Sequence, residues 1–299
     1  MKALVIGSEG NIGKPLVKHL IKKGYDVLSV DHRPNWRDGY LMADINNPAD
    51  LIAAFQWEPD VVFALSAMVS RVTCEQAASL AVATNLTGLQ NMIEFTKMVG
   101  AKFVYFSTSE VYGPDCEIMD EIETTPVPNN RYGLTKLLGE SLVEHDVKYH
   151  GLKAVTLRPF MMYDEDEDLG DHRSAMIRFV TNLARGEEIE VHEGSARGWF
   201  HVSDAVRAIE ASVHHTEEYG VFNIGHPDIV PIADMAEMVR LELDAPKELV
   251  KVVPFPGQMT AIKQPSLHRM QNILGVKPKV DLKEGISLVC KKIGPRITS

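Results

Sequence analysis

Short apolar runs alternate with amphipathic segments over the first half of the chain. The runs cover residues 2–6, 26–30, 61–67, 103–107 and 155–159. Each is short enough to be a strand buried on both faces, and the segments between them carry apolar residues at helical spacing, as at Leu16, Val17 and Leu20. This alternation predicts an α/β fold with a doubly wound parallel sheet. Ligands of such a sheet bind beyond the carboxyl ends of its strands.

The pattern changes after about residue 165, where a helical segment at 175–185 is followed by a short strand at 188–192. A chain of 299 residues also exceeds what a single hydrophobic core usually supports. We therefore expect a large domain at residues 1–165 and a smaller mixed α/β domain at residues 166–299.

A glycine-rich turn joins the first apolar run to the first helical segment. Gly7, Gly10 and Gly13 have the spacing of the dinucleotide-binding fingerprint, in the strand–turn–helix context that this fingerprint requires. Gly7 permits a tight turn, Gly10 lets the backbone approach a pyrophosphate, and Gly13 lets the helix pack closely on the strand. The free N–H groups of the helix N-terminus then face the phosphates. The turn predicts a Rossmann-type nucleotide site.

The second apolar run ends in Asp31. A carboxylate at this position accepts hydrogen bonds from ribose hydroxyls and repels a 2′-phosphate, which favours NAD over NADP. Arg33, two residues later, argues partly against this because it suits a 2′-phosphate as well as an adenine face. NAD is therefore the expected cofactor, with NADP the alternative.

Two segments on the carboxyl side of the fifth run carry candidate chemistry. Tyr132 and Lys136 are four residues apart, so a helix would place both side chains on one face. A neighbouring ammonium lowers the pKa of a phenol, which lets the phenolate act as a base. Thr108 and Glu110, just after the strand at 103–107, would supply a hydrogen-bonding hydroxyl and a second base.

Composition narrows the class of protein. Hydrophobic and charged residues make up 45% and 24% of the chain, as in ordinary globular proteins, and no apolar run is long enough to span a membrane. The net charge of −10 argues against nonspecific nucleic-acid binding. Three widely spaced cysteines fit a reducing cytoplasm, and no Cys/His spacing indicates a metal site.

With these motifs, the chain resembles an extended short-chain dehydrogenase/reductase of the nucleotide-sugar epimerase and dehydratase family. Further matches are Asp44-Ile45, the strand ending in Leu65-Ser66-Ala67, Asn85-Leu-Thr-Gly88 and Arg158-Pro159. The resemblance implies tightly bound NAD, a nucleoside-diphosphate sugar as substrate, and a homodimer. It also implies that segments near 195–225 return in part to the large domain. The cofactor residues that it implies are Gly7, Gly10, Asn11, Ile12, Gly13, Asp31, Arg33, Asp44, Ile45, Leu65, Ser66, Ala67, Asn85, Ser107, Tyr132, Lys136, Pro159 and Phe160.

The resemblance also implies a reaction through a 4-keto sugar. Tyr132, assisted by Lys136 and Thr108, would take the proton of the 4-hydroxyl while hydride leaves C4 for NAD. Glu110 would then remove the C5 proton, which favours a 4,6-dehydratase. A 4-epimerase, a UDP-glucuronate decarboxylase, a reductase of the same superfamily and a non-catalytic NAD-binding regulator remain alternatives.

Several positions depart from the family pattern. Met161 stands where the family commonly has a substrate-binding Asn, and Lys263-Gln-Pro-Ser266 replaces an Arg-x-x-Asp pair, so the nucleotide cannot be identified. The acidic run Asp164 to Asp168 is expected to be a solvated loop, with a divalent cation or an amino sugar as the sharper alternative. The candidate substrate residues are Ser109, Met161, Arg173, Arg178 and Arg197.

Overall fold

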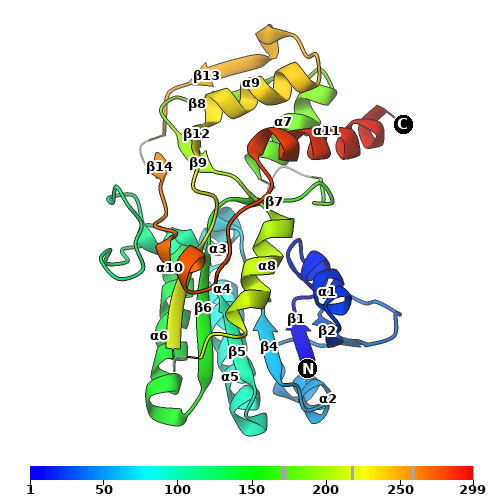
Figure 1. Cartoon of the computed structure of the whole chain (residues 1–299), viewed down its shortest axis with the longest axis vertical. Coiled ribbons are helices and arrows are strands. Elements are labelled where there is room, and N and C mark those ends of the chain that lie inside the picture. Colours follow the sequence, from blue (N-terminus) through cyan, green and yellow to red (C-terminus); the bar gives the residue numbers. More distant parts are fainter. Residues whose placement is uncertain (170–173, 217–218, 257–259, 299) are drawn as a thin grey trace.

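A computed structural model describes residues 1–169, 174–216, 219–256 and 260–298. Its main element is a seven-stranded parallel sheet with the strand order β11-β6-β5-β4-β1-β2-β3 (Figure 1). The strands are β1 (Lys2–Ile6), β2 (Asp26–Asp31), β3 (Tyr40–Met42), β4 (Val61–Ala64), β5 (Lys102–Phe106), β6 (Lys153–Pro159) and β11 (Tyr219–Ile224). The predicted α/β class and parallel sheet are confirmed.

Helices cover both faces of this sheet because successive strand residues point to opposite sides. Ala3 and Val5 of β1 pack in a core with α1 (Gly13–Lys22), α8 (Val202–Ser212) and α10 (His268–Asn272). Leu4 and Ile6 pack in a second core on the other face. The helices of that second core are α2 (Pro48–Gln56), α5 (Gly88–Val99) and α6 (Arg131–His150).

Short elements line the carboxyl edge of the sheet. Between β4 and α5 lie α3 (Arg71–Gln76), α4 (Ala78–Val82) and a π-helical turn at Ala83–Thr87. A single 3₁₀ turn at Ser109–Tyr112 follows β5.

A smaller lobe has its own apolar core above this edge (Figure 1). Its helices are α7 (Ala175–Ala184), α9 (Ile232–Glu242) and α11 (Leu282–Thr298), with a 3₁₀ turn at Lys247–Leu249. Three short sheets accompany them: β7 (Met162–Tyr163) with β10 (Phe200–His201), β8 (Ile189–His192) with β13 (Val250–Val253), and β12 (Ile229–Pro231) with β9 (Ala196–Gly198) and β14 (Ile262–Lys263).

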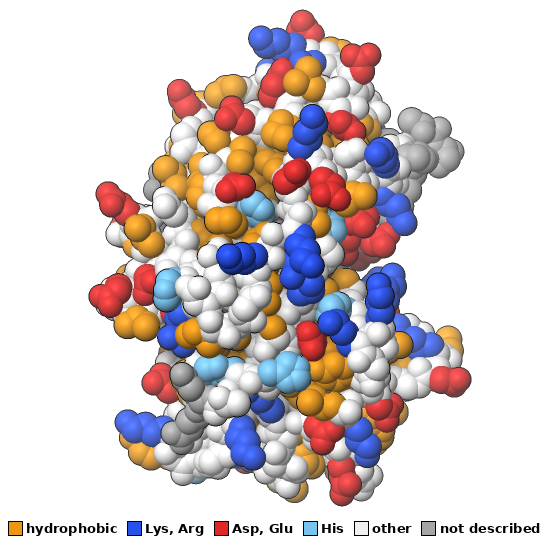
Figure 2. Space-filling view, in the orientation of Figure 1, with side chains coloured by type: hydrophobic (Ala, Val, Ile, Leu, Met, Phe, Trp, Pro, Cys, Tyr) orange, Lys and Arg blue, Asp and Glu red, His pale blue; other side chains and the backbone are white. Residues whose placement is uncertain are grey.

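The chain passes between the two lobes several times. After β9 and β10, α8 packs against α1 and β11 pairs in parallel with β6, so this stretch lies in the layers of the large sheet. Both acidic and basic side chains are distributed over the face shown in Figure 2. Among the described residues, no helix combines the length and the apolar character needed to cross a membrane.

Candidate functional site

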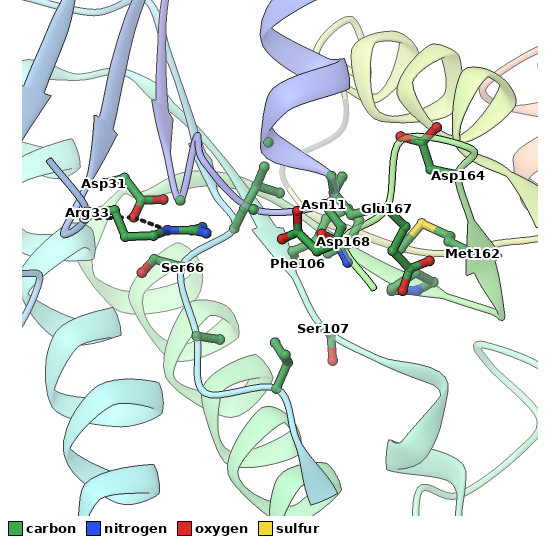
Figure 3. A pocket seen from close by; sticks show the side chains of 18 of the residues that line it. Asn11, Asp31, Arg33, Ser66, Phe106, Ser107, Met162, Asp164, Glu167 and Asp168 are labelled. Atoms are coloured by element: carbon green, nitrogen blue, oxygen red, sulfur yellow. Dashed lines mark hydrogen bonds and ion pairs between the residues drawn. The ribbon is translucent and has the colours of Figure 1, made fainter. Parts of the chain in front are cut away.

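A cavity of about 430 Å³ opens at the carboxyl ends of β1, β2, β4, β5 and β6 (Figure 3). This is the edge at which a sheet of this topology binds its ligands. Many of the predicted cofactor residues line it: Gly7, Gly10, Asn11, Ile12, Gly13, Asp31, Arg33, Leu65, Ser66, Ala67, Ser107, Tyr132 and Pro159.

The glycine turn leaves no room for side chains. Gly7 has a φ of +91°, and a Cβ atom there would lie 2.7 Å from the backbone nitrogen of Ser66. A Cβ on Gly13 would clash with the carbonyl oxygen of Gly7. Helix α1 begins at Gly13 with no side-chain cap and no acidic residue in its first turn, so its N-terminal N–H groups suit an anionic ligand such as a pyrophosphate.

Asp31 is buried at the end of β2, where it fixes the turn as well as facing the cavity. Its carboxylate accepts hydrogen bonds from the backbone N–H of Glu9 at 2.9 Å and of Arg33 at 3.1 Å. Burial alone raises the pKa of Asp31, but these bonds and the Arg33 guanidinium outweigh burial and lower it. Asp31 is therefore a carboxylate at neutral pH, as recognition of ribose hydroxyls requires.

Five of the expected cofactor residues do not line the cavity: Asp44, Ile45, Asn85, Lys136 and Phe160. Asp44 accepts a bond from the backbone of Asn46, and Ile45 packs in the core beneath α5. The buried Asn85 amide donates to the Met68 carbonyl at 3.1 Å and to the Thr135 hydroxyl at 3.0 Å, so it joins the loop after β4 to α6. Phe160 is buried against Tyr112, with ring centroids 6.2 Å apart.

The expected lowering of the Tyr132 pKa by Lys136 does not appear in this structure. Both residues lie in the first turns of α6, but the Lys136 ammonium donates to the Phe106 carbonyl at 2.6 Å. Burial lowers the pKa of Lys136 to about 7. Burial also raises the pKa of the Tyr132 phenol. A hydrogen bond with Thr108 lowers this pKa, and the nearby Glu110 carboxylate raises it. Thr108 thus contacts the phenol.

A buried polar network beneath Tyr132 escaped sequence reasoning. Arg158 donates to both carboxylate oxygens of Glu140, at 3.0 and 2.7 Å, and to the Tyr112 hydroxyl at 2.8 Å. Ser107 donates to Glu140, and Tyr112 bonds Asn223 on β11. The bidentate pair ties α6 to β6, and Ser107 at the end of β5 bonds the same carboxylate. The sequence signals for Arg158 were its apolar setting and the match of Arg158-Pro159 to the family pattern, and neither indicated its partners.

Glu110 lies next to Tyr132 among cationic side chains. It forms an ion pair with Lys263 of β14, accepts a bond of 2.9 Å from the amide of Asn130, and lies 3.6 Å from Nε of Arg71. Burial raises the pKa of Glu110, but Lys263 and Arg71 outweigh burial and lower it. Neither cation was predicted to face Glu110.

Arg197 is buried on β9 and donates to the carbonyls of Thr260 at 2.6 Å and Ala261 at 2.5 Å. Asp204, seven residues later in the chain, pairs with Arg207 and not with Arg197. Burial lowers the pKa of Arg197 to about 10, while Glu110 raises it. Arg197 thus braces the strand that carries Lys263.

The remaining substrate candidates are dispersed. Ser109 is buried 3.4 Å from the Lys263 ammonium. Met161 packs against the core of the smaller lobe, and Arg178 is exposed on α7. Arg173 lies outside the described residues.

The acidic run is not a fully solvated loop, contrary to expectation. Asp164 and Glu167 are only 8% and 6% exposed, and with Asp168 they line the cavity (Figure 3). His201 is 2.8 Å from Glu165, and its other ring nitrogen accepts a bond from the Ser203 backbone. The ligand-type atoms of Asp164, Glu165 and His201 lie within 4.8 Å of one another, but the His201–Glu165 hydrogen bond already satisfies the imidazole.

Comparisons with known proteins agree with this geometry. The sequence model described as "NAD dependent epimerase/dehydratase family" matches residues 3–225. The chain is 27% identical to UDP-glucuronic acid decarboxylase 4 of Arabidopsis thaliana, over 99% of this chain and 69% of that protein.

Solved structures are also similar. The UDP-glucose 4-epimerase of Thermotoga maritima, solved with UDP-glucose, has a TM-score of 0.91 at 25% identity, covering 99% of both chains. The dTDP-glucose 4,6-dehydratase DesIV of Streptomyces venezuelae, solved with NAD, has a TM-score of 0.85 at 21% identity, covering 98% of this chain and 96% of that one.

Proposed function

Because this chain belongs to the NAD-dependent epimerase/dehydratase family, we propose that it oxidises C4 of a nucleoside-diphosphate sugar and then acts at C5 through Glu110. The observation that carries the proposal is the setting of Tyr132, which lines the cavity together with Ser107, forms a hydrogen bond with Thr108 and lies within electrostatic reach of the Glu110 carboxylate. Tyr132 and Glu110 are two groups able to transfer a proton, and Thr108 adds a hydroxyl.

The cavity fits NAD. The turn at Gly7, Gly10 and Gly13 and the uncapped start of α1 would hold the pyrophosphate. The Asp31 carboxylate would accept hydrogen bonds from the adenosine ribose. We favour NAD over NADP because the buried carboxylate of Asp31 would repel a 2′-phosphate, although Arg33 lies beside it. Bound NAD supplies the acceptor for the hydride that leaves C4 and the donor that returns it.

Tyr132 would take the proton of the sugar 4-hydroxyl, and Thr108 would share a hydrogen bond with that oxygen. A phenol with a raised pKa is a poor base, so Tyr132 needs a cation near its oxygen. Lys136, one helical turn away, and the positive nicotinamide ring are the candidates. The phenol is thus expected to become a working base only in the complex with cofactor.

Glu110 would act after the first oxidation, when the 4-ketone has made the C5 proton acidic. Transfer of that proton to the carboxylate, loss of the C6 hydroxyl as water, and return of hydride to C6 with reprotonation of C5 complete a 4,6-dehydration. The carboxylate is suited to this role because hydrogen bonds and cations keep it ionised at neutral pH. The enzyme would then be a lyase.

Decarboxylation of a UDP-glucuronate-type sugar is the second candidate, and the cations around Glu110 favour it. Lys263 and Arg71 both lie beside the single Glu110 carboxylate. This excess of positive charge suits a second anionic group, such as the carboxylate of a sugar. A 4-ketone labilises that carboxylate as carbon dioxide, after which C5 takes a proton and hydride returns to C4. A UDP-glucuronic acid decarboxylase of Arabidopsis thaliana matches nearly the whole chain.

The test is NMR of the purified protein with NAD and UDP-, GDP- and dTDP-hexoses or UDP-glucuronate in deuterated water. Deuterium at C5 with a deoxygenated C6 would support dehydration, and deuterium at C5 with loss of C6 would support decarboxylation. A C4-inverted sugar without deuterium would identify a 4-epimerase. In a parallel assay, stoichiometric consumption of added NADPH would identify a reductase, and binding without turnover a regulator.

A further inference from the structure

The ion pair between Lys263 and Glu110 joins two distant parts of the chain. Glu110 follows β5 in the large sheet, whereas Lys263 lies on β14 in the smaller lobe. The lysine is only 5% exposed, and its ammonium also lies 3.4 Å from the Ser109 hydroxyl. A lysine side chain buried this far from water keeps its proton only while a nearby negative charge compensates the ammonium.

The groups that face Glu110 come from every element packed around it. Arg71 on α3 is 3.6 Å away, Asn130 at the start of α6 donates at 2.9 Å, and Tyr132 lies on the same helix. Arg197 on β9 contributes a third cation, although its donors are used by backbone carbonyls. Among the described neighbours of Glu110, cations outnumber carboxylates.

We propose that Lys263 is a positioning residue that holds Glu110 in an ion pair until an anionic group of the substrate takes its place. The inference rests on the proposed function, since Glu110 must be the group that acts at C5. An arriving anion would be attracted by Arg71 and Lys263 together and would compete with Glu110 for the ammonium. The carboxylate would then be free to turn toward the sugar.

Releasing the pair also changes the basicity of Glu110. Burial raises the pKa of this carboxyl and Lys263 lowers it, so loss of Lys263 leaves the effect of burial in place. The carboxylate becomes a stronger base when substrate is bound and stays a weak one otherwise. Proton abstraction is thereby coupled to occupation of the site.

The displacing anion has one chemistry and two possible sources within a nucleotide sugar. It is either the diphosphate or the carboxylate of a hexuronate, and both present anionic oxygens to an ammonium. UDP alone and D-glucuronate alone separate the two sources.

The experiment titrates Glu110 directly in the full-length, NAD-loaded protein. Glutamate labelled with ¹³C at the side-chain carboxyl is observed by NMR, and the Glu110 signal is the one lost in Glu110→Gln. The titration midpoint is measured for the protein alone, with saturating UDP, and with D-glucuronate. We expect an upward shift with at least one of them. A bound ligand that leaves the midpoint unchanged would overturn the proposal without any substitution at Lys263.

Substitutions of Lys263 test its role in this titration directly. Lys263→Met should raise the midpoint without ligand and abolish the ligand-induced shift, whereas Lys263→Arg should keep both wild-type values. Lys251→Met, which removes a surface pair with Glu188 at 3.4 Å, is the matched control and should titrate like the wild type. A wild-type titration in Lys263→Met would contradict the role of Lys263. Calorimetry separates the two proposals: if no nucleoside diphosphate or nucleotide sugar binds, the proposed function itself fails.

Discussion

The Nζ atom of Lys136 lies 2.6 Å from the carbonyl oxygen of Phe106, the last residue of β5. The ammonium is 4.8 Å from the centre of the Tyr105 ring, and Glu140 is the nearest carboxylate that raises its pKa. Burial nevertheless dominates and lowers the pKa of Lys136 to about 7. Folding thus disfavours the cationic form of Lys136, the residue proposed to assist Tyr132.

Lys136→Met should therefore stabilise the cofactor-free protein at neutral and acidic pH. Below about pH 7 the folded state bears the full cost of burying the charge, and between about 7 and 10.5 only the unfolded chain stays protonated. The free energy of unfolding of the wild type should rise across that interval by up to about 1.4 kcal/mol per pH unit. The measurement is urea unfolding of both proteins at several pH values, with exposed Lys148→Met as control. If the difference in the free energy of unfolding between the wild type and Lys136→Met does not change with pH, the prediction is contradicted.

Gly13→Ala should weaken cofactor binding because its methyl group would clash with the Gly7 carbonyl oxygen. We expect NAD affinity to fall at least about tenfold, with about 1–3 kcal/mol lost from the free energy of unfolding. Calorimetry with NAD and urea unfolding check the two effects. Gly294→Ala, whose added methyl group meets nothing within 4 Å, is the control and should keep NAD affinity. Equal NAD affinities in both variants would argue against a pyrophosphate at this turn.

Tyr132→Phe should reduce kcat at least about 100-fold, since it removes the hydroxyl that we propose takes the proton of the sugar 4-hydroxyl. The phenol contacts Thr108 but carries no part of the buried Glu140–Arg158 pair, so the fold and NAD affinity should persist. Tyr149→Phe, on the exposed end of the same helix, serves as control. Turnover near the wild-type rate in Tyr132→Phe would refute the assigned base.

Glu110→Gln should separate oxidation at C4 from chemistry at C5. The amide keeps the size of the side chain but cannot accept a proton from C5, so reduced nicotinamide should accumulate on the enzyme while deuterium no longer enters C5. Absorbance of the reduced cofactor and NMR of the sugar follow the two steps, with exposed Glu117→Gln as control. Continued exchange at C5 would assign the C5 base to another group.

We expect a homodimer that pairs through α6 and its neighbours. Leu134 and Leu138, one turn apart on α6, are 43% and 44% exposed, and Leu80 and Val82 on α4 are exposed nearby. Leu138→Glu should convert a dimer at micromolar concentration to a monomer in analytical ultracentrifugation. Ile273→Glu, at the end of α10 on the opposite side of the sheet, should leave the mass unchanged. A monomeric wild-type protein would exclude this interface.

Local patterns predicted the sheet, the glycine turn and Asp31 because each depends on residues close in sequence. Asp31 follows directly from the end of an apolar run, and the turn from three glycines within seven residues. The partners of Glu110 did not follow, since Lys263 reaches it across 153 positions and through a strand of the other lobe. The burial that lowers the pKa of Lys136 is likewise a property of the packed site, whereas its spacing from Tyr132 is a property of one helix.

The return of the chain to the large sheet at β11 bears on how this protein can be re-engineered. Asn223 on that strand bonds Tyr112, which in turn accepts from Arg158 beneath the site. A fragment ending near residue 165 would lack a strand of its own sheet and one end of this polar chain. A substrate-binding lobe transplanted from another protein would therefore have to be inserted in two separate segments, one after β6 and one after β11. The α8 and β11 elements between them would be kept from this chain.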